Sequence, residues 1–480
     1  MFILLAIFFL QFADKAGSER VCLSPTAIEM RAERGIEIDS LDYEVSPRYL
    51  DSIRALGGQI LHTSRWMNGA TVKAKKGDEA CFEKCSFVNR VYVTRPGVMR
   101  PPLSNLTAPR RKTEVTLTDS VYYGQAQKQL EHYNLLPLHQ DGYHGQGIRI
   151  GIADAGFANA DKLEALMPVR SQWLGYTDFT DGTTDIFDPS ETHGSLCLSS
   201  IMAVHENYLG AATQAEYYLF CTEETETESH KEIDNWVAAI EMADSLGLHI
   251  VTTSLGYRTF DDEEYDFSYQ DMDGHTTRGA KAATIAARKG MLLVVAMGND
   301  GDKDWHYLST PADADSILSV GAVGLNDTVA QFSSYGPASD GRVKPEVCAV
   351  GVQTALINPN TNRVTYSNGT SFACPLIAGM AACLWSALPY ASNMDIRERI
   401  IRSADRYNQP HEQYGYGIPD AWLAYQMELS TPTNNIGSNR ETKSTKLILY
   451  RGELLILHNN TLYDILGNTI KQNTNILTKF

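Results

Sequence analysis

The sequence predicts an α/β protein built on a parallel sheet with helices on both faces. Between residues 119 and 428, apolar segments of strand length alternate with segments of helical period. The strand-like segments are apolar throughout, which is typical of strands buried on both faces. They lie at 148–153, 216–221, 249–253, 291–297 and 317–323. Helical segments at 231–246 and 276–289 separate them, the first with its apolar side chains on one face.

A smaller α+β domain is predicted before this region, over residues 19–94. It opens with a helical segment at 47–56, which Gly57 and Gly58 end. Further elements are strands at 59–63, 70–73 and 88–94 and a short helix at 79–84. This order favours a split-βαβ, ferredoxin-like arrangement.

The N-terminus is interpreted as a signal peptide over residues 1–18. Residues 1–10 (MFILLAIFFL) form a continuous apolar run. This run is too short to span a bilayer and matches the core of a signal peptide in length. No basic region precedes it, so a start upstream of Met1 and a chance hydrophobic terminus are the alternatives. We therefore expect a secreted protein, extracellular or at the cell surface.

Two linkers are predicted from composition. Residues 95–118 mix prolines with Arg and Lys, as in exposed, extended chain that is open to proteolysis. Residues 429–446 are rich in Ser, Thr and Asn. The following β-type segment, 447–480, is too short to bury a core alone, so it is either an incomplete domain or an appendage that packs on another structure.

The composition of the chain argues against some classes of binding partner. The chain has 41 Lys and Arg against 58 Asp and Glu, a net charge of −17, which argues against nucleic acid and anionic membrane surfaces. Its eight cysteines form no C-x-x-C pair, so we expect neither a dense disulfide framework nor a zinc ribbon. Buried, inert thiols are the favoured interpretation.

Three local features indicate catalysis when they are taken together. Asp154 directly follows the first core strand, and the carboxyl ends of strands line the ligand crevice in open α/β sheets. His193 opens an apolar helical segment. Ser371 precedes another, where free N–H groups and the helix dipole favour negative charge. Each feature alone is weak, because such residues usually cap helices or fill turns.

Together these residues supply the groups that acyl transfer needs. A serine hydroxyl becomes a nucleophile when an imidazole removes its proton, and a carboxylate fixes the tautomer of that imidazole. Asn299, after the 291–297 strand and Gly298, is a candidate hydrogen-bond donor to the developing oxyanion. A turn asparagine in G-N-D-G (298–301) explains Asn299 equally well on local evidence.

The pattern resembles the subtilisin-like serine proteases. The shared feature is the chain order Asp, His, Ser within the flanks D-x-G, H-G-x and G-T-S-x-A-x-P, which surround Asp154, His193 and Ser371. Further matching blocks extend the resemblance over residues 145–424. Among them are S-L-G (254–256), A-M-G-N (296–299), F-S-S-Y-G-P (332–337) and Y-G-Y-G-I-P-D-A (414–421).

The resemblance implies a subtilisin-like fold and a secreted serine endopeptidase that works through an acyl-enzyme and is made as a zymogen. Ser371 would be the nucleophile, His193 the general base and then acid, and Asp154 its orienting partner. Asn299 and the Ser371 N–H would form the oxyanion hole. The substrate-binding residues that it implies are Ser254, Leu255 and Gly256, which would pair with substrate backbone, and Ala296, Met297 and Gly298, which with them would wall the S1 pocket.

The resemblance also gives the flanks a role. Residues 19–94 would be an inhibitory propeptide, 95–118 the maturation region and 119–428 the peptidase domain. The tail, with L-Y-D-I-L-G-N (462–468), resembles the sorting domain of the type IX secretion route. The implied partners are polypeptide substrates, the protein's own propeptide and the secretion machinery, and no cofactor is required.

The departures from the family pattern are modest. Ala155 stands where Ser or Thr is usual, Ser195 replaces Thr, and Gly210-Ala211-Ala212 lacks a proline. None of these changes removes a catalytic group. A catalytically inactive binding module of the same fold is the alternative function, and the intact catalytic residues argue against it.

Other enzyme classes fit less well. A nucleotide-binding G-x-G-x-x-G turn must follow its strand, whereas Gly145, Gly147 and Gly151 precede the first strand or lie within it. An α/β-hydrolase needs G-x-S-x-G, and Ala373 occupies the place of its second glycine.

Two acidic runs raise the question of calcium. They comprise Glu223, Glu224, Glu226 and Glu228, and Asp261–Glu264 with Asp266. Neither run has the glycine-turn spacing of a calcium loop, so we interpret both as solvated loop charge and predict no metal site.

Overall fold

The computed structural model describes residues 5–95, 122–180, 185–224 and 227–427, and the backbone of short segments within 445–463. The chain divides into two compact units, residues 1–428 and 429–480, and each is described by itself. Most of the first predicted linker, the second linker up to residue 444, and residues 464–480 of the tail lie outside the described residues.

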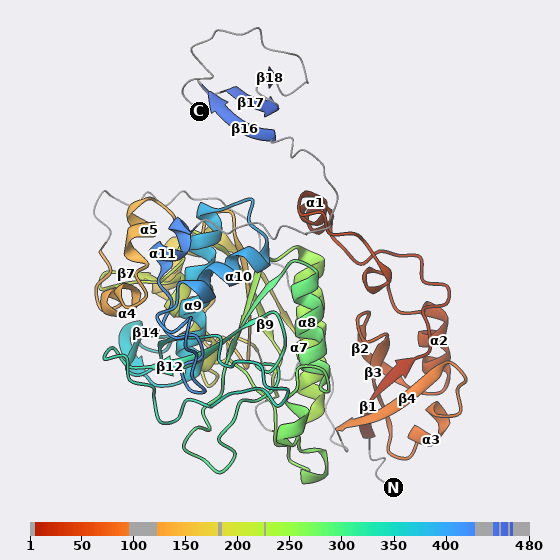
Figure 1. Ribbon diagram of the computed structural model, residues 1–480. Helices are drawn as coiled ribbons and strands as arrows, with labels where there is room; N and C mark the ends of the chain where they lie inside the picture. Colours follow the sequence, from red (N-terminus) through yellow and green to blue (C-terminus); the bar gives the residue numbers. More distant parts are fainter. Residues whose placement is uncertain are drawn as a thin grey trace. The chain divides into compact units, whose positions relative to one another are not determined.

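A seven-stranded parallel sheet forms the centre of the first unit, which confirms the predicted fold class (Figure 1). Its strands, in spatial order, are β13 (Val347–Val350), β12 (Leu318–Val323), β11 (Leu292–Ala296), β10 (Ile250–Thr253), β5 (Arg149–Asp154), β9 (Glu216–Cys221) and β6 (Trp173–Asp178). The sequence predicted five of these strands and missed β13 and β6, which lie at the two edges.

Helices cover both faces of this sheet. Helices α6 (His193–Met202) and α9 (Thr370–Ala387) share one core with Leu292 and Val294 of β11. Helices α7 (His230–Leu246) and α8 (Arg278–Arg288) share the other with Leu293 and Val295. Neighbouring residues of one strand thus enter opposite cores, which explains the continuously apolar pattern.

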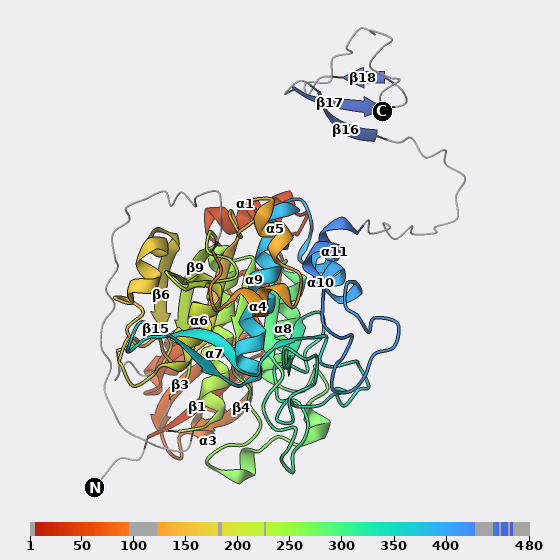
Figure 2. The same cartoon turned by 90° about the vertical axis from the view of Figure 1, so that its left-hand side faces the viewer.

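Helix α9 runs through the middle of this unit (Figure 2). It is long and apolar enough to cross a membrane, but 89% of it is buried within the protein, as expected for a core helix. The other helices of this region are α4 (Gln127–Glu131), α5 (Leu136–Gln140), α10 (Asn393–Arg402) and α11 (Ala421–Gln426). Small antiparallel pairs are formed by β7 (Val204–His205) with β8 (Tyr208–Leu209), and by β14 (Thr354–Asn358) with β15 (Arg363–Ser367).

The N-terminal α+β domain, residues 5–95, has a four-stranded antiparallel sheet in the order β2-β3-β1-β4. Its elements are β1 (Leu5–Phe12), α1 (Pro25–Glu33), α2 (Pro47–Ala55), β2 (Gln59–Ser64), β3 (Gly69–Lys75), α3 (Glu79–Phe82) and β4 (Val88–Arg95). The split-βαβ arrangement is therefore present, and it includes a strand that the sequence had not assigned to it.

That strand corrects the interpretation of the N-terminus. The apolar run that was predicted to belong to a signal peptide at 1–18 forms β1, which lies between β3 and β4 and is hydrogen-bonded to both. Phe8, Leu10 and Phe12 are buried in the core of the N-terminal domain. A signal peptide is removed from the mature protein, so a strand at the centre of this sheet does not fit that interpretation.

The second unit contains a three-stranded antiparallel sheet. Its strands are β16 (Thr445–Tyr450), β17 (Glu453–His458) and β18 (Thr461–Tyr463). The predicted β-type pattern of the tail is confirmed over these residues.

Candidate active site

The ends of three neighbouring strands bring the predicted site residues together. Strand β10 lies between β5 and β11, and its register pairs Thr253 with Ala153 on one side and Val295 on the other. The next residues, Asp154, Ser254 and Ala296, therefore lie at the same level, at the carboxyl ends of the three strands. The predicted crevice at the carboxyl ends of the strands is thus the place where these segments meet.

Asp154 and His193 form a hydrogen-bonded pair. The His193 Nδ1–H donates to Asp154 Oδ1 over 2.8 Å, and the Ala155 N–H donates to the same oxygen over 2.8 Å. The Asp154 side chain is fully buried, whereas 39% of the His193 side chain is exposed. The Asp154 carboxylate raises the pKa of His193, outweighing the opposite effect of burial. In the neutral imidazole this arrangement leaves Nε2 unprotonated, as a general base requires.

Ser371 lies in the first turn of α9, close to the helix that carries His193. Gly369 precedes that turn with a φ of 153°, a conformation suited to glycine. The ring centroids of Phe372 and His193 are 5.8 Å apart. Among the described residues no hydrogen bond joins Ser371 Oγ to His193; this hydroxyl lies 3.5 Å from the Ser254 carbonyl oxygen. The hydrogen bond between a catalytic hydroxyl and its base is often long in the absence of substrate.

Asn299 lies beside the same helix start, with its side-chain oxygen held from behind. The Thr370 N–H donates to Asn299 Oδ1 over 2.9 Å, and the Thr370 hydroxyl donates to it over 3.1 Å. The Thr370 hydroxyl in turn accepts from the Gly298 N–H over 3.2 Å. These contacts fix the amide so that Nδ2, the donor end, stays available for an anionic oxygen.

The two predicted substrate-binding segments follow neighbouring strands. Residues 254–256 continue from β10, and residues 296–298 span the end of β11. A Cβ placed on Gly256 would lie 3.2 Å from Ser309 Cβ. One on Gly298 would lie 2.9 Å from Ser334 Oγ and 3.8 Å from Ser309 Oγ. Ser309 therefore lies near both segments, and Ser334 lies closest to Gly298. Sequence reasoning did not assign Ser309 to the site, because it lies in a loop.

Cys197 is a second residue that the sequence analysis did not place at the site. It lies one turn after His193 on α6, and its thiol is 3.4 Å from the Ser371 carbonyl oxygen and 3.5 Å from Ser254 Oγ. Its sulfur and one ligand atom each of Asp154 and His193 lie within 4.8 Å of one another. The i, i+4 spacing from His193 is a signal that could have found it. Burial raises the pKa of this thiol well above its usual value, so it stays protonated.

The first acidic run is only partly solvated loop charge. Glu223 and Glu228 come within 4.8 Å of Glu232 on α7, and burial raises the pKa of Glu223 and of Glu228 to about 7. Glu224 instead forms ion pairs with Arg95 and Lys231. Glu226 lies outside the described residues.

The second acidic run, at 261–266, satisfies backbone donors. Asp261 Oδ2 accepts from the Glu228 N–H over 3.2 Å, and Asp266 Oδ1 accepts from the Phe260 N–H over 2.7 Å. Asp262 caps a short 3₁₀ turn at Glu263–Tyr265. These roles are those of loop-capping carboxylates.

The arrangement of Asp154, His193 and Ser371 at the carboxyl edge of a parallel sheet is the one expected of a serine peptidase. The model of the subtilase family matches residues 145–417, more than half of the chain, and the chain belongs to that family. A second model, the peptidase S8 propeptide domain of Bacteroidota, matches residues 8–107. This match begins within β1, in agreement with the place of that strand in the N-terminal domain.

Comparisons with individual relatives support the same family. The thermostable alkaline protease of Halalkalibacterium halodurans is 28% identical over 328 residues, 67% of this chain and 78% of the relative. Subtilisin DY of Bacillus licheniformis is 28% identical over 288 residues, 59% of this chain and 93% of the relative. The crystal structure of an epidermin leader peptide processing serine protease from Staphylococcus aureus shares the fold, with a TM-score of 0.60, 14% identity, and coverage of 89% of this chain and all of that one.

The protein is therefore a subtilisin-like serine endopeptidase that carries an N-terminal propeptide. Its partners are polypeptide substrates and its own propeptide.

Proposed function

We propose that the chain is the zymogen of a secreted endopeptidase that cleaves peptide bonds with Asp154, His193 and Ser371. The observation that carries this proposal is the 2.8 Å contact between His193 Nδ1 and Asp154 Oδ1 beside the helix start that bears Ser371. The contact supplies an oriented base. The helix start supplies the nucleophile, together with a backbone N–H for which the described part of the chain shows no hydrogen-bond acceptor.

In the first step the Ser371 oxygen forms a bond to the substrate carbonyl carbon while its proton moves to His193 Nε2. The electron pair of the C=O bond moves to the oxygen, which accepts hydrogen bonds from Asn299 Nδ2 and the Ser371 N–H. When the oxygen pair returns, the C–N bond breaks and the amine leaves with the His193 proton. Water then repeats the sequence on the acyl-enzyme and restores Ser371.

Replacement of the nucleophile tests this assignment. The Ser371→Ala variant should lose peptide hydrolysis and linker cleavage, whereas Ser386→Ala, which changes a hydroxyl at the other end of α9 that donates to Cys383 O, should keep both. Labelling of Ser371 by a fluorophosphonate after linker cleavage separates an active enzyme from an inactive binding module. Persisting hydrolysis in Ser371→Ala would refute the mechanism.

We further propose the division of the chain. The propeptide ends near residue 94, 95–118 is the maturation region, 119–428 the peptidase domain, 429–446 a linker and 447–480 a sorting tail of type IX kind. Secretion is the expectation that the similarity to the subtilisins carries, and the match to a propeptide domain supports synthesis as a zymogen. Deletion of 429–480 should leave peptidase activity intact and retain the enzyme inside the cell; secretion of the truncated enzyme at the normal level would refute the role of the tail.

A further inference from the structure

The propeptide carries a segment that leaves its own sheet and reaches the peptidase domain. This arm, residues 13–46, joins β1 to α2 and contains α1 and a 3₁₀ turn at Ser40–Asp42. Helix α1 lies apart from the propeptide sheet and near α7 (Figure 1). The Ser24 N–H donates to the Ser245 carbonyl oxygen over 2.8 Å.

The arm binds the peptidase domain at the end opposite to the active site. Arg34 donates to the Gly290 carbonyl oxygen over 3.0 Å, and its guanidinium lies 4.8 Å from the Trp385 ring centroid. Gly290 precedes β11, whereas Asn299 follows that strand. The propeptide therefore follows α7 along its length, with Arg95 paired to Glu224 near the start of α7 and the arm at its end.

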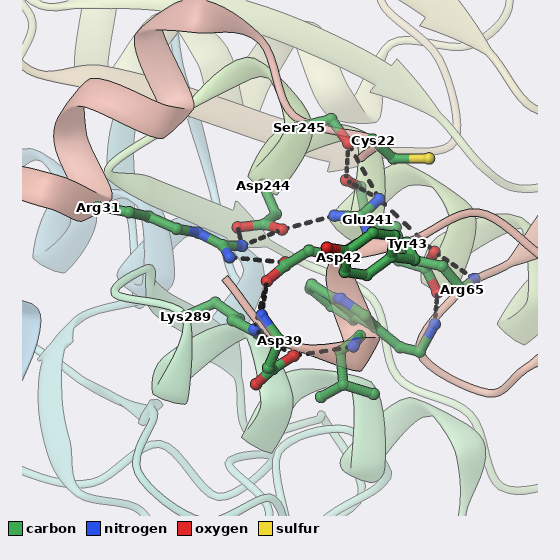
Figure 3. A network of polar contacts seen from close by, with 12 residues as sticks. Cys22, Arg31, Asp39, Asp42, Tyr43, Arg65, Glu241, Asp244, Ser245 and Lys289 are labelled. Atoms are coloured by element: carbon green, nitrogen blue, oxygen red, sulfur yellow. Dashed lines mark hydrogen bonds and ion pairs between the residues drawn. The ribbon is translucent and has the colours of Figure 1, made fainter. Parts of the chain in front are cut away.

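Buried ion pairs hold the arm in place (Figure 3). Arg31 contacts both oxygens of Asp244 at 2.7 Å and Asp42 at 2.6 Å. Arg65, from the turn between β2 and β3, donates to the same Asp244 over 2.5 Å. Lys289 of the peptidase domain reaches across to Asp42 over 2.9 Å. The side chains of these five residues are at most 7% exposed.

Glu241, one turn before Asp244, is held in the same way by the propeptide. It accepts hydrogen bonds from the Ser64 hydroxyl over 2.5 Å and from the Arg65 N–H over 2.9 Å. Carboxylates near a helix C-terminus are unfavourable, and the last turn of α7, described in full, carries no basic residue. The favourable charges come from the propeptide, so this face is suited to a cationic partner.

We propose that Glu241, Asp244 and Lys289 form a rear docking site that holds the propeptide after the linker is cut. The two carboxylates recognise Arg31 and Arg65, and Lys289 recognises Asp42. Cleavage between residues 95 and 122 alone then does not free the enzyme, because the propeptide dissociates only when these buried pairs break. Removal of one member of such a pair leaves a buried charge without its partner, which raises the dissociation rate. The physiological meaning rests on the proposed function, but the binding itself does not.

The test uses the full chain with Ser371→Ala and a recognition sequence for a site-specific protease placed within residues 96–121. After cleavage, gel filtration over time gives the rate at which the propeptide leaves. The parent should retain it, and Arg31→Ala and Arg65→Ala should each release it about 30-fold faster or more. Arg54→Ala is the matched control, since Arg54 is 54% exposed and pairs only within α2.

A double-mutant cycle with Asp244→Asn tests whether Arg31 acts through its contact with Asp244. Arg31→Ala and Asp244→Asn together should speed release by much less than the product of the two single effects. If Arg31→Ala prevents folding of the uncut chain, Arg31→Lys, which keeps the charge and loses the two-oxygen contact, should still speed release. Release at the parent rate from the arginine variants, or immediate release from the parent, would overturn the proposal. The release rate does not depend on catalysis, because every chain in this test carries Ser371→Ala. Failure of the peptidase function would show separately, as missing hydrolysis by the matured chain that keeps Ser371.

Discussion

His193 and Asp154 are joined across 2.8 Å, with the carboxylate wholly buried and the imidazole partly exposed. This contact places the Asp154 carboxylate against the His193 imidazole, which must take up and release a proton during catalysis. Since the base acts as neutral imidazole, hydrolysis should fall as the pH drops through the raised pKa of His193, which lies above the usual 6.5.

Asp154→Asn should separate the two effects of this contact. The pH midpoint of kcat/KM should move down, because the charge that raises the pKa of His193 is gone. The plateau of kcat should fall about 10⁴-fold, since the amide favours the wrong imidazole tautomer. Steady-state kinetics on a peptide substrate between pH 5 and 9 measure both, and Asp327→Asn, at an exposed carboxylate, serves as the control. An unchanged midpoint would contradict the assigned coupling.

Asn299→Ala should lower kcat about 10²- to 10³-fold with little change in KM, because the amide acts on charge that develops only in the transition state. Asn326→Ala, in an exposed turn, provides the comparison. A rise in KM at constant kcat would mean that Asn299 binds substrate and does not stabilise an oxyanion.

The residues at the strand ends were predictable because each stands in a local motif. Asp154 and Asn299 follow apolar strands, so parallel-sheet topology alone brings them to one edge. Ser371 is marked by the apolar helix that it opens. Ser309 and the contact of Arg31 with Asp244 had no such signal, since loop packing and a pairing across 213 residues depend on the folded structure.

The interpretation of β1 as part of a signal peptide was wrong for a different reason. Phe8 and Leu10 enter the core of the propeptide, whereas Phe9 enters the core formed with α7 of the peptidase domain. A strand buried on both faces loses the alternation that marks a half-exposed one. Its apolar run then has the same composition as the core of a signal peptide, and composition alone could not separate the two.

Glu228→Gln should stabilise the zymogen at pH 8 and have little effect at pH 4. The pKa of Glu228 rises from 4.5 to about 7 on folding, mainly through burial and then through the charge of Asp261. The folded state therefore binds more protons between these values, so stability falls as the pH rises from about 4.5 to 7. Glutamine removes this penalty, a gain of about 1–3 kcal/mol.

Urea unfolding of the Ser371→Ala chain at the two pH values measures this gain. Glu412→Gln, at an exposed glutamate, is the matched control and should change little at either pH. An equal gain for Glu228→Gln at both pH values would contradict a titrating origin.

The place of β1 in the propeptide predicts that the folded zymogen retains residues 5–12. Phe8→Ala should lower the free energy of unfolding of the propeptide by about 3–5 kcal/mol, because the ring fills a core at 1% exposure. Gln11→Ala, on a partly exposed residue of the same strand, should cost much less. Urea unfolding of the Ser371→Ala zymogen and its intact mass measure the two expectations. A purified, fully folded zymogen whose mass shows a start after residue 18 would exclude β1 from the sheet, because the propeptide would then have reached its fold without its central strand.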